Sequence, residues 1–190
     1  MNTVFVDVDG VLLDYNKPFV KHWNEGIDSG LYTGAHIMHN PVTWTFGLTQ
    51  DDDQSELDRA TMIFHDTHTP LPLLHPGVVD GLRHLYSKYN VEILSSYPDL
   101  DKRKHNLDLH NLVYHNINCN IQDKLSHINA HVAQGNNVVC IIEDGPHHID
   151  KLLPEYAGKV WSPNMWNYLK DYLSDPRIRF YSNPVEWCRL

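Results

Sequence analysis

The chain has 190 residues, a length that fits one domain with room for a small insertion. Hydrophobic residues make up 42% of it, enough for a packed core, and a formal charge of −9 lacks the basic footprint of a duplex nucleic-acid binder. Its three cysteines are widely spaced, which favours a reducing compartment over a disulfide framework. Because the sequence shows neither a signal-peptide pattern nor a long apolar run, we expect a soluble, cytoplasmic protein that does not enter a membrane.

The first expected element is a buried strand over residues 3–6, where β-branched and aromatic residues follow one another. Asp7, Asp9 and Gly10 come at its end. Alternate residues of a strand face the same way, so the two carboxylates project together, and Gly10 allows a sharp turn. Like charges repel there unless a cation lies between them or one is protonated. The pair predicts a Mg²⁺ site or a nucleophile with its acid/base partner, with two solvated loop aspartates as the alternative.

Residues 14–76 differ in character from the rest of the chain. Two helices are expected in them, over residues 16–24 and 55–65, with an acidic run directly before the second. The stretch is too long for an ordinary loop. We therefore expect a helical cap over residues 14–76, inserted after the first strand of a core formed by residues 1–13 and 77–190.

Strands and helices alternate in the remainder of the sequence. Helices are expected over residues 78–89, 101–112, 122–132, 147–156 and 163–173. Strands are expected over residues 91–96, 113–117, 137–142, 159–161 and 177–181. This alternation predicts an α/β fold with right-handed crossovers and a parallel sheet flanked by helices. Trp187 is expected to cover an edge of the core.

Polar residues at the ends of the later segments are candidates for phosphate binding. Ser95 and Ser96 end the strand over residues 91–96, on the same sheet edge as Asp7, and a hydroxyl there can hold a phosphate oxygen. Turn formation is the alternative for two serines. Lys124 lies near a helix N-terminus, where the dipole disfavours a cation, so we expect it to face a bound anion; a surface lysine is the alternative.

A second acidic pair, Glu143-Asp144, ends the clearest buried strand, over residues 137–142. Carboxylates that end two strands on one sheet edge make a site for a hard cation such as Mg²⁺. This convergence favours a functional over a structural explanation.

Two other features of the sequence carry less chemistry. The basic run over residues 102–104 is interpreted as a solvated helix face, with a contact to substrate as the alternative. The 14 histidines raise the hypothesis of a zinc enzyme, but none has the HExxH spacing or a clear third ligand nearby. Solvated or capping histidines are the preferred interpretation.

The stretch Asp7-Val8-Asp9-Gly10-Val11 resembles the first motif of the haloacid dehalogenase superfamily, which ends the first strand of a Rossmann-like sheet. Ser95, Lys124 and Glu143-Asp144 match the second, third and fourth motifs in order. The resemblance implies that Asp7 attacks phosphorus and that Asp9 acts as general acid and then base. It also implies that Mg²⁺ is held by Asp7, the backbone carbonyl of Asp9 and Asp144, and that Ser95, Ser96 and Lys124 bind the phosphate.

Within the superfamily the chain is most similar to the 5′(3′)-deoxyribonucleotidases, through residues 73–78, 123–124 and 142–146. Glu143 stands where these enzymes usually have a second aspartate, and Ser95 where threonine is common; neither change removes a needed functional group. Glu143 is accordingly expected to contact the metal ligands and not the metal ion itself. The residues expected to hold the base lie in the cap: Phe19, Trp44 and Phe46.

The resemblance implies a Mg²⁺-dependent phosphomonoesterase that dephosphorylates (deoxy)nucleoside monophosphates. We expect the chain to be a monomer or homodimer. Its expected partner is a small phosphorylated substrate, not a long nucleic acid. Two alternatives stay open. One is a superfamily phosphatase for another small phosphomonoester, such as a sugar phosphate or phospholipid head group, or for a nucleic-acid 3′ end. The other is a binding protein without enzymatic activity.

Overall fold

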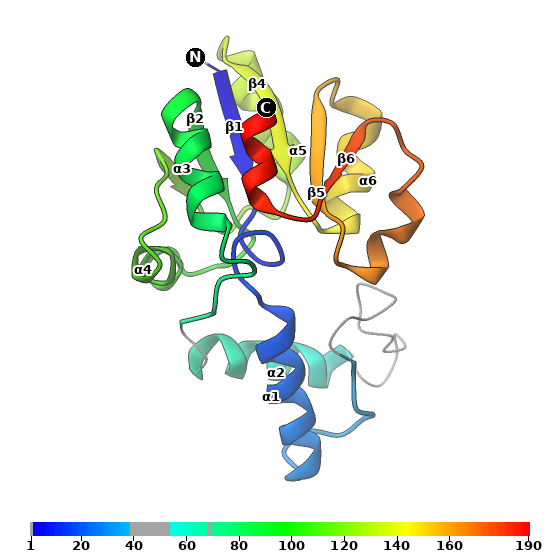
Figure 1. Ribbon diagram of the computed structural model, residues 1–190. Helices are drawn as coiled ribbons and strands as arrows, with labels where there is room; N and C mark the ends of the chain where they lie inside the picture. The colour runs from blue at the N-terminus through cyan, green and yellow to red at the C-terminus, as the bar shows by residue number, and fades with distance from the viewer. Residues whose placement is uncertain (1, 39–53, 68–69) are drawn as a thin grey trace.

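The computed structural model describes residues 2–38, 54–67 and 70–190, and a six-stranded, fully parallel sheet lies at its centre (Figure 1). In spatial order the strands are β3 (Asn116–Asn118), β2 (Asn90–Leu94), β1 (Asn2–Val6), β4 (Asn137–Ile142), β5 (Lys159–Pro163) and β6 (Ile178–Tyr181). The chain order reverses between β1 and β4, and open α/β sheets bind ligands at the carboxyl ends of strands beside such a switch point.

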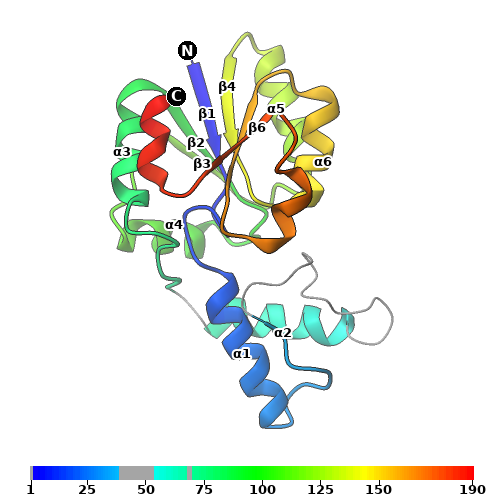
Figure 2. The same cartoon turned by 45° about the vertical axis from the view of Figure 1, so that its right-hand side comes forward.

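Helices cover both faces of this sheet (Figure 2). They are α3 (Val78–Lys88), α4 (Leu100–Leu109), α5 (Lys124–Ala133), α6 (Pro146–Glu155) and the 3₁₀-helices η1 (Asn167–Tyr172) and η2 (Pro184–Arg189). Val6 of β1 lies in one buried cluster with Leu82 of α3 and Trp187 of η2. Phe5, one residue earlier, lies in a second cluster with Ile128 of α5. A strand that is apolar on both faces is typical of a covered parallel sheet, and the predicted Rossmann-like α/β fold is confirmed.

Two further helices, α1 (Asn16–Asp28) and α2 (Gln54–Thr67), lie beyond the carboxyl ends of the strands (Figures 1 and 2). They pack on each other, with the rings of Phe19 and Phe64 meeting edge to face at 5.4 Å. The segments that lead to and from them are paired side by side: the Asp14 N–H donates to the Pro72 carbonyl, and the Leu74 N–H to the Leu12 carbonyl, each at 2.9 Å. Both helices expected in residues 14–76 are therefore present, and the boundaries of the cap stay a prediction.

The prediction of a helix over residues 163–173 is wrong. Pro163 instead ends β5, where it pairs with Tyr181, and a short 3₁₀-helix follows at η1. The tight geometry serves two side chains, since Trp166 donates to the Gly10 carbonyl at 3.0 Å and Tyr168 donates to Asp144 at 2.7 Å. A regular helix beginning at residue 163 would carry these side chains on different faces.

The C-terminal helix η2 was not expected, although its sequence carries a start signal. Asn183 and Glu186 form a capping box. The Asn183 side chain accepts from a backbone N–H of the first turn, and the Glu186 side chain accepts from the Asn183 N–H. The helix places Trp187 against α3 with its side chain fully buried, so the prediction that Trp187 covers an edge of the core is confirmed. Among the described residues, no helix is both long and apolar enough to cross a membrane.

Candidate active site

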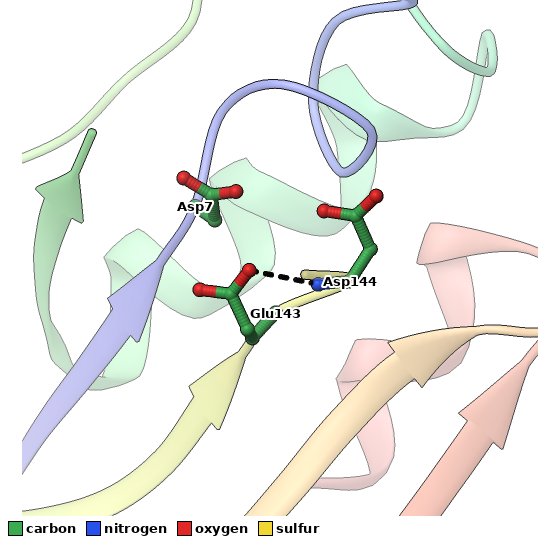
Figure 3. Close-up of side chains that lie close together, drawn as sticks. All are labelled: Asp7, Glu143 and Asp144. Atoms are coloured by element: carbon green, nitrogen blue, oxygen red, sulfur yellow. Dashed lines mark hydrogen bonds between the residues drawn. The ribbon is translucent and has the colours of Figure 1, made fainter. Parts of the chain in front are cut away.

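Three carboxylates meet where β1 and β4 end side by side (Figure 3). Asp7 follows β1, and Glu143 and Asp144 follow β4, with one oxygen of each within 4.8 Å of the others. The strands hold this spacing, because the Asp7 N–H donates to the Ile142 carbonyl at 2.9 Å and so continues the ladder past the end of β1. Glu143 and Asp144 are buried, and such a concentration of negative charge requires cations close by.

Lys124 supplies one of these positive charges. It is the first residue of α5, and its buried ammonium lies 2.7 Å from both Asp7 and Glu143. Burial alone would lower the pKa of Lys124, but the two facing carboxylates outweigh burial and raise its pKa, so the side chain stays charged. The neighbouring Asp123 caps α5 by accepting from the Ser126 N–H, which fixes where the helix begins.

One lysine does not neutralise three carboxylates, and the pKa values of both aspartates in the cluster are raised. Burial and the Glu143 charge raise the pKa of Asp7 to about 6, although Lys124 opposes the shift. Burial, then Asp7 and Glu143, also raise the pKa of Asp144. One oxygen of Asp144 accepts from Tyr168, while Oδ1 is buried with no hydrogen-bond partner among the described residues. An unpartnered carboxylate oxygen beside other oxygens fits Mg²⁺, which takes oxygen ligands and few carboxylates.

Gly10 is required by this arrangement for two reasons. Its φ of +79° lies in the left-handed region, and a Cβ there would fall 2.0 Å from the nearest Asp144 carboxylate oxygen. The loop after β1 therefore lies directly against Asp144. Any side chain at position 10 would displace a carboxylate of the cluster.

Asp9 does not face this cluster; its carboxylate is held by Arg103 of α4. The two guanidinium nitrogens lie 3.0 and 2.5 Å from the two Asp9 oxygens, a bidentate pair. The guanidinium carbon also lies 4.3 Å from the centre of the Tyr97 ring. Arg103 is 2% exposed, so the prediction of a solvated face over residues 102–104 is wrong for this residue. Buried Asn106 and Leu107, three and four positions later on the same helix face, were the signal for its burial.

The two serines predicted to bind phosphate have different surroundings. Ser95 is buried, and its hydroxyl accepts from the Tyr97 N–H at 3.2 Å, the local bond that the turn-forming alternative describes. Ser96 lines the cleft described next, and its hydroxyl donates to the Ile121 carbonyl at 3.1 Å. Phosphate binding by either serine stays a prediction.

A cleft of about 430 Å³ opens above the carboxylates, between the edge of the sheet and α2. Pockets of this size take small molecules. Residues of α2 line one wall: Leu57, Asp58, Thr61 and His65. On the core side, the wall includes Ser96, Tyr97, Gln122, His147 and His148.

Of the three cap residues expected to contact substrate, Phe19 does not line the cleft. It is buried between α1 and α2, with Tyr15 stacked on it at 5.3 Å. Tyr15 is the aromatic residue that reaches the cleft in its place. Trp44 and Phe46 lie outside the described residues.

No family model and no curated protein is similar enough to this chain to count as a match. Solved structures match its fold over nearly their whole length. A haloacid dehalogenase-like hydrolase from Streptococcus pneumoniae is 18% identical with a TM-score of 0.65, and the match covers 97% of this chain and 95% of that one. A haloacid dehalogenase-like hydrolase from Xanthomonas campestris is 14% identical with a TM-score of 0.65, and the match covers 100% of this chain and 93% of that one. A predicted phosphoglycolate phosphatase from Haemophilus somnus is 12% identical with a TM-score of 0.68, and the match covers 98% of this chain and 96% of that one. The chain therefore has the Rossmann-like fold of the haloacid dehalogenase-like hydrolases.

Proposed function

We propose that the protein is a Mg²⁺-dependent phosphomonoesterase that works through an aspartyl-phosphate intermediate. The observation that carries the proposal is the position of Asp7, which lies at the floor of a small-molecule cleft with Lys124 at 2.7 Å and an acidic pair on the next strand. A carboxylate so placed can attack an anionic phosphate only where positive charge offsets the repulsion between them. Lys124 supplies part of that charge, and the carboxylates offer ligands for a Mg²⁺ ion that would supply the rest.

In the proposed reaction, an Asp7 oxygen forms a bond to phosphorus while the bond to the ester oxygen breaks. In this structure Asp9 is paired with Arg103 as a carboxylate, so it must take up a proton from solvent as the substrate binds. It gives that proton to the leaving alkoxide and then takes one from the water that cleaves the aspartyl-phosphate. Lys124 neutralises charge on the equatorial oxygens. Asp7, Asp144 and the backbone carbonyl of Asp9 would hold Mg²⁺, which supplies further positive charge at those oxygens.

Glu143 holds neighbouring groups of this site in place through hydrogen bonds. Its Oε2 accepts from Lys124 at 2.7 Å, and its Oε1 accepts from the backbone N–H groups of Asp144 and Gly145 at 3.1 and 2.8 Å. It thus fixes both the lysine and the turn that carries Asp144.

Two substrate classes have a specific observation in their favour. Nucleoside monophosphates follow from the resemblance to 5′(3′)-deoxyribonucleotidases, and the Tyr15 ring in the cleft offers a surface on which a base or sugar can pack. Other small phosphomonoesters, such as sugar phosphates, follow from the fold shared with a neighbour named as a predicted phosphatase.

The experiment is phosphate release from a panel of 5′- and 3′-(deoxy)nucleoside monophosphates and sugar phosphates, each with Mg²⁺ and with EDTA. Mg²⁺-dependent release biased to deoxynucleotides would support both the reaction and the nucleotidase assignment. Release from other phosphates alone would retain the catalytic residues and discard the nucleotide. A panel with no turnover under any condition would contradict the proposed function.

Arg103 is expected to act as a positioning residue for Asp9. Replacing it with methionine leaves the Asp9 carboxylate without its bidentate partner, so we expect hydrolysis of alkyl phosphates to fall by about 10²-fold, the usual contribution of general acid–base catalysis. Arg103→Lys should recover only part of the rate, because an ammonium cannot make two parallel bonds and does not stack on Tyr97 in the same way.

p-Nitrophenyl phosphate gives the control, because its leaving group needs little protonation. Its kcat should fall much less in both Arg103 variants than the kcat for an alkyl phosphate. An equal fall for the two substrates would indicate that Arg103 serves the fold alone.

A further inference from the structure

Positive charge is scarce in the cleft, and this limits what the substrate can be. Of its 15 lysines and arginines, the chain places Lys124 alone in the cleft wall formed by the described residues. That ammonium is already shared between Asp7 and Glu143. Three histidines also line the cleft, but burial lowers the pKa of His65, His147 and His148, the last to about 3, so they are neutral there.

Three cations near the cleft are held by other partners, and a fourth, Lys151 of α6, affects the pKa values of the cleft-lining His147 and His148 without lining the cleft itself. Arg103 is bound to Asp9, Lys102 of α4 pairs with Asp66 at 2.7 Å, and Arg59 of α2 binds Glu56 and the Leu31 carbonyl. The sequence over residues 39–53 and 68–69 contains neither lysine nor arginine. These parts of the chain therefore bring no further cation of either kind.

The wall opposite the catalytic carboxylates is neutral or acidic. With the phosphate at Asp7 and Lys124, the rest of the substrate must extend toward α2, where Leu57, Asp58 and Thr61 line the cleft. A second anion placed there would face the Asp58 carboxylate, and no lysine or arginine of the described residues lines the cleft there to pair with it. Partly buried charges without a partner are strongly disfavoured.

We propose, on the basis of the proposed phosphomonoesterase activity, that the substrate carries no anionic group other than the phosphate that is removed, so that its leaving group is neutral apart from the ester oxygen. The class is a phosphate ester of a neutral hydroxylated alcohol, such as a nucleoside or a polyol. Carboxylated phosphates and bisphosphates are excluded by charge, including phosphoglycolate, for which one structural neighbour is named. Neutral polar side chains in the wall, such as Thr61 and Gln122, suit hydroxyl or amide groups.

The test compares substrates that differ in one charged group, at a fixed concentration of free Mg²⁺. The first pair is 2-hydroxyethyl phosphate and phosphoglycolate, and the second is thymidine 5′-monophosphate and thymidine 3′,5′-bisphosphate. In each pair we expect kcat/KM to be at least about tenfold higher for the member without the extra anion, the effect of roughly 1.4 kcal/mol in the transition state. Equal kcat/KM values within the pairs would overturn the inference and leave the phosphomonoesterase activity standing. Absence of turnover for all four would instead contradict the proposed function itself.

A charge reversal on α2 assigns the effect to the cleft wall. Asp58→Lys should raise kcat/KM for the members that carry a second anionic group at least about tenfold relative to their partners, and Asp58→Asn should shift the ratio less in the same direction. Glu25→Gln is the control matched to Asp58→Asn, because each removes one negative charge and Glu25 lies at an exposed position on α1, where it pairs with Lys21. A ratio that Asp58→Lys leaves unchanged, or that Glu25→Gln changes as much as Asp58→Asn does, would overturn the role given to the wall.

Discussion

Replacing Asp7 with asparagine is expected to abolish Mg²⁺-dependent phosphate release, with kcat reduced by at least about four orders of magnitude. The amide has the shape of the carboxylate but cannot form the acyl-phosphate bond to phosphorus. Phosphate release is measured with the best substrate of the panel, and circular dichroism checks that the variant is folded. Near-normal turnover in a clean preparation of the variant would show the covalent scheme to be wrong.

The same variant is expected to be more stable than the wild-type protein in the absence of metal. Because the pKa of Asp7 is raised to about 6, the folded state binds its proton more tightly than the unfolded state does. The proton on Asp7 therefore stabilises the folded state at low pH, and this stabilisation is lost as the pH rises through 6. At pH 7.5 the ionised side chain lowers the free energy of unfolding by about 2–3 kcal/mol. Asparagine cannot ionise and removes this loss of stability.

Thermal unfolding in EDTA measures this difference. The melting temperature of Asp7→Asn should exceed that of the wild type at pH 7.5, and the gap should narrow at pH 5. Mg²⁺ should stabilise the wild type more than the variant, because Asp7 is a proposed ligand. A variant that is less stable than the wild type at pH 7.5 would mean that the pairing of Asp7 with Lys124 outweighs the repulsion from Glu143.

Replacing Lys124 with methionine is expected to have the second-largest effect. The variant loses the charge 2.7 Å from Asp7 and Glu143, so the partly buried Asp7 and the buried Glu143 are left without their cation. Breaking a buried ion pair costs about 3–5 kcal/mol of stability, and removing one stabilising group of a transition state costs about 10²–10³ in kcat. Denaturant unfolding and steady-state kinetics measure the two effects.

A second substitution separates these effects. Adding Glu143→Gln to Lys124→Met removes one of the two orphaned charges, while the glutamine oxygen can still accept from the Asp144 and Gly145 N–H groups. Stability should partly recover and activity should not. If activity recovered along with stability, Lys124 would be needed for the fold and not for the phosphate.

The carboxylate cluster was predictable from sequence because it depends on local rules. The strands that precede Asp7 and Glu143 are short apolar runs, and parallel strands carry their carboxyl ends to one edge whatever their exact pairing. Lys124 was recognisable because a cation at a helix N-terminus contradicts the dipole. Its partners, Asp7 and Glu143, explain that exception.

The contacts that the sequence did not reveal join segments far apart in the chain. The Asp9–Arg103 pair spans 94 positions, and the bond from Tyr168 to Asp144 spans 24. Neither Arg103, within a basic run, nor Tyr168, after Pro163, carries a pattern that names its partner. Only the packing of α4 and η1 on the edge of the sheet brings them to the site.

The paired segments around residues 12–14 and 72–74 bring the two ends of the stretch that carries α1 and α2 together, while the Lys102–Asp66 pair also joins α2 to α4. Because Asp14 and Pro72 are already hydrogen-bonded, everything between them could be lengthened, shortened or exchanged without moving a strand. Insertions whose ends are adjacent are the kind that a fold tolerates best. The edge of the sheet can thus keep its carboxylates in place while the segment that carries α1 and α2 changes in length or sequence.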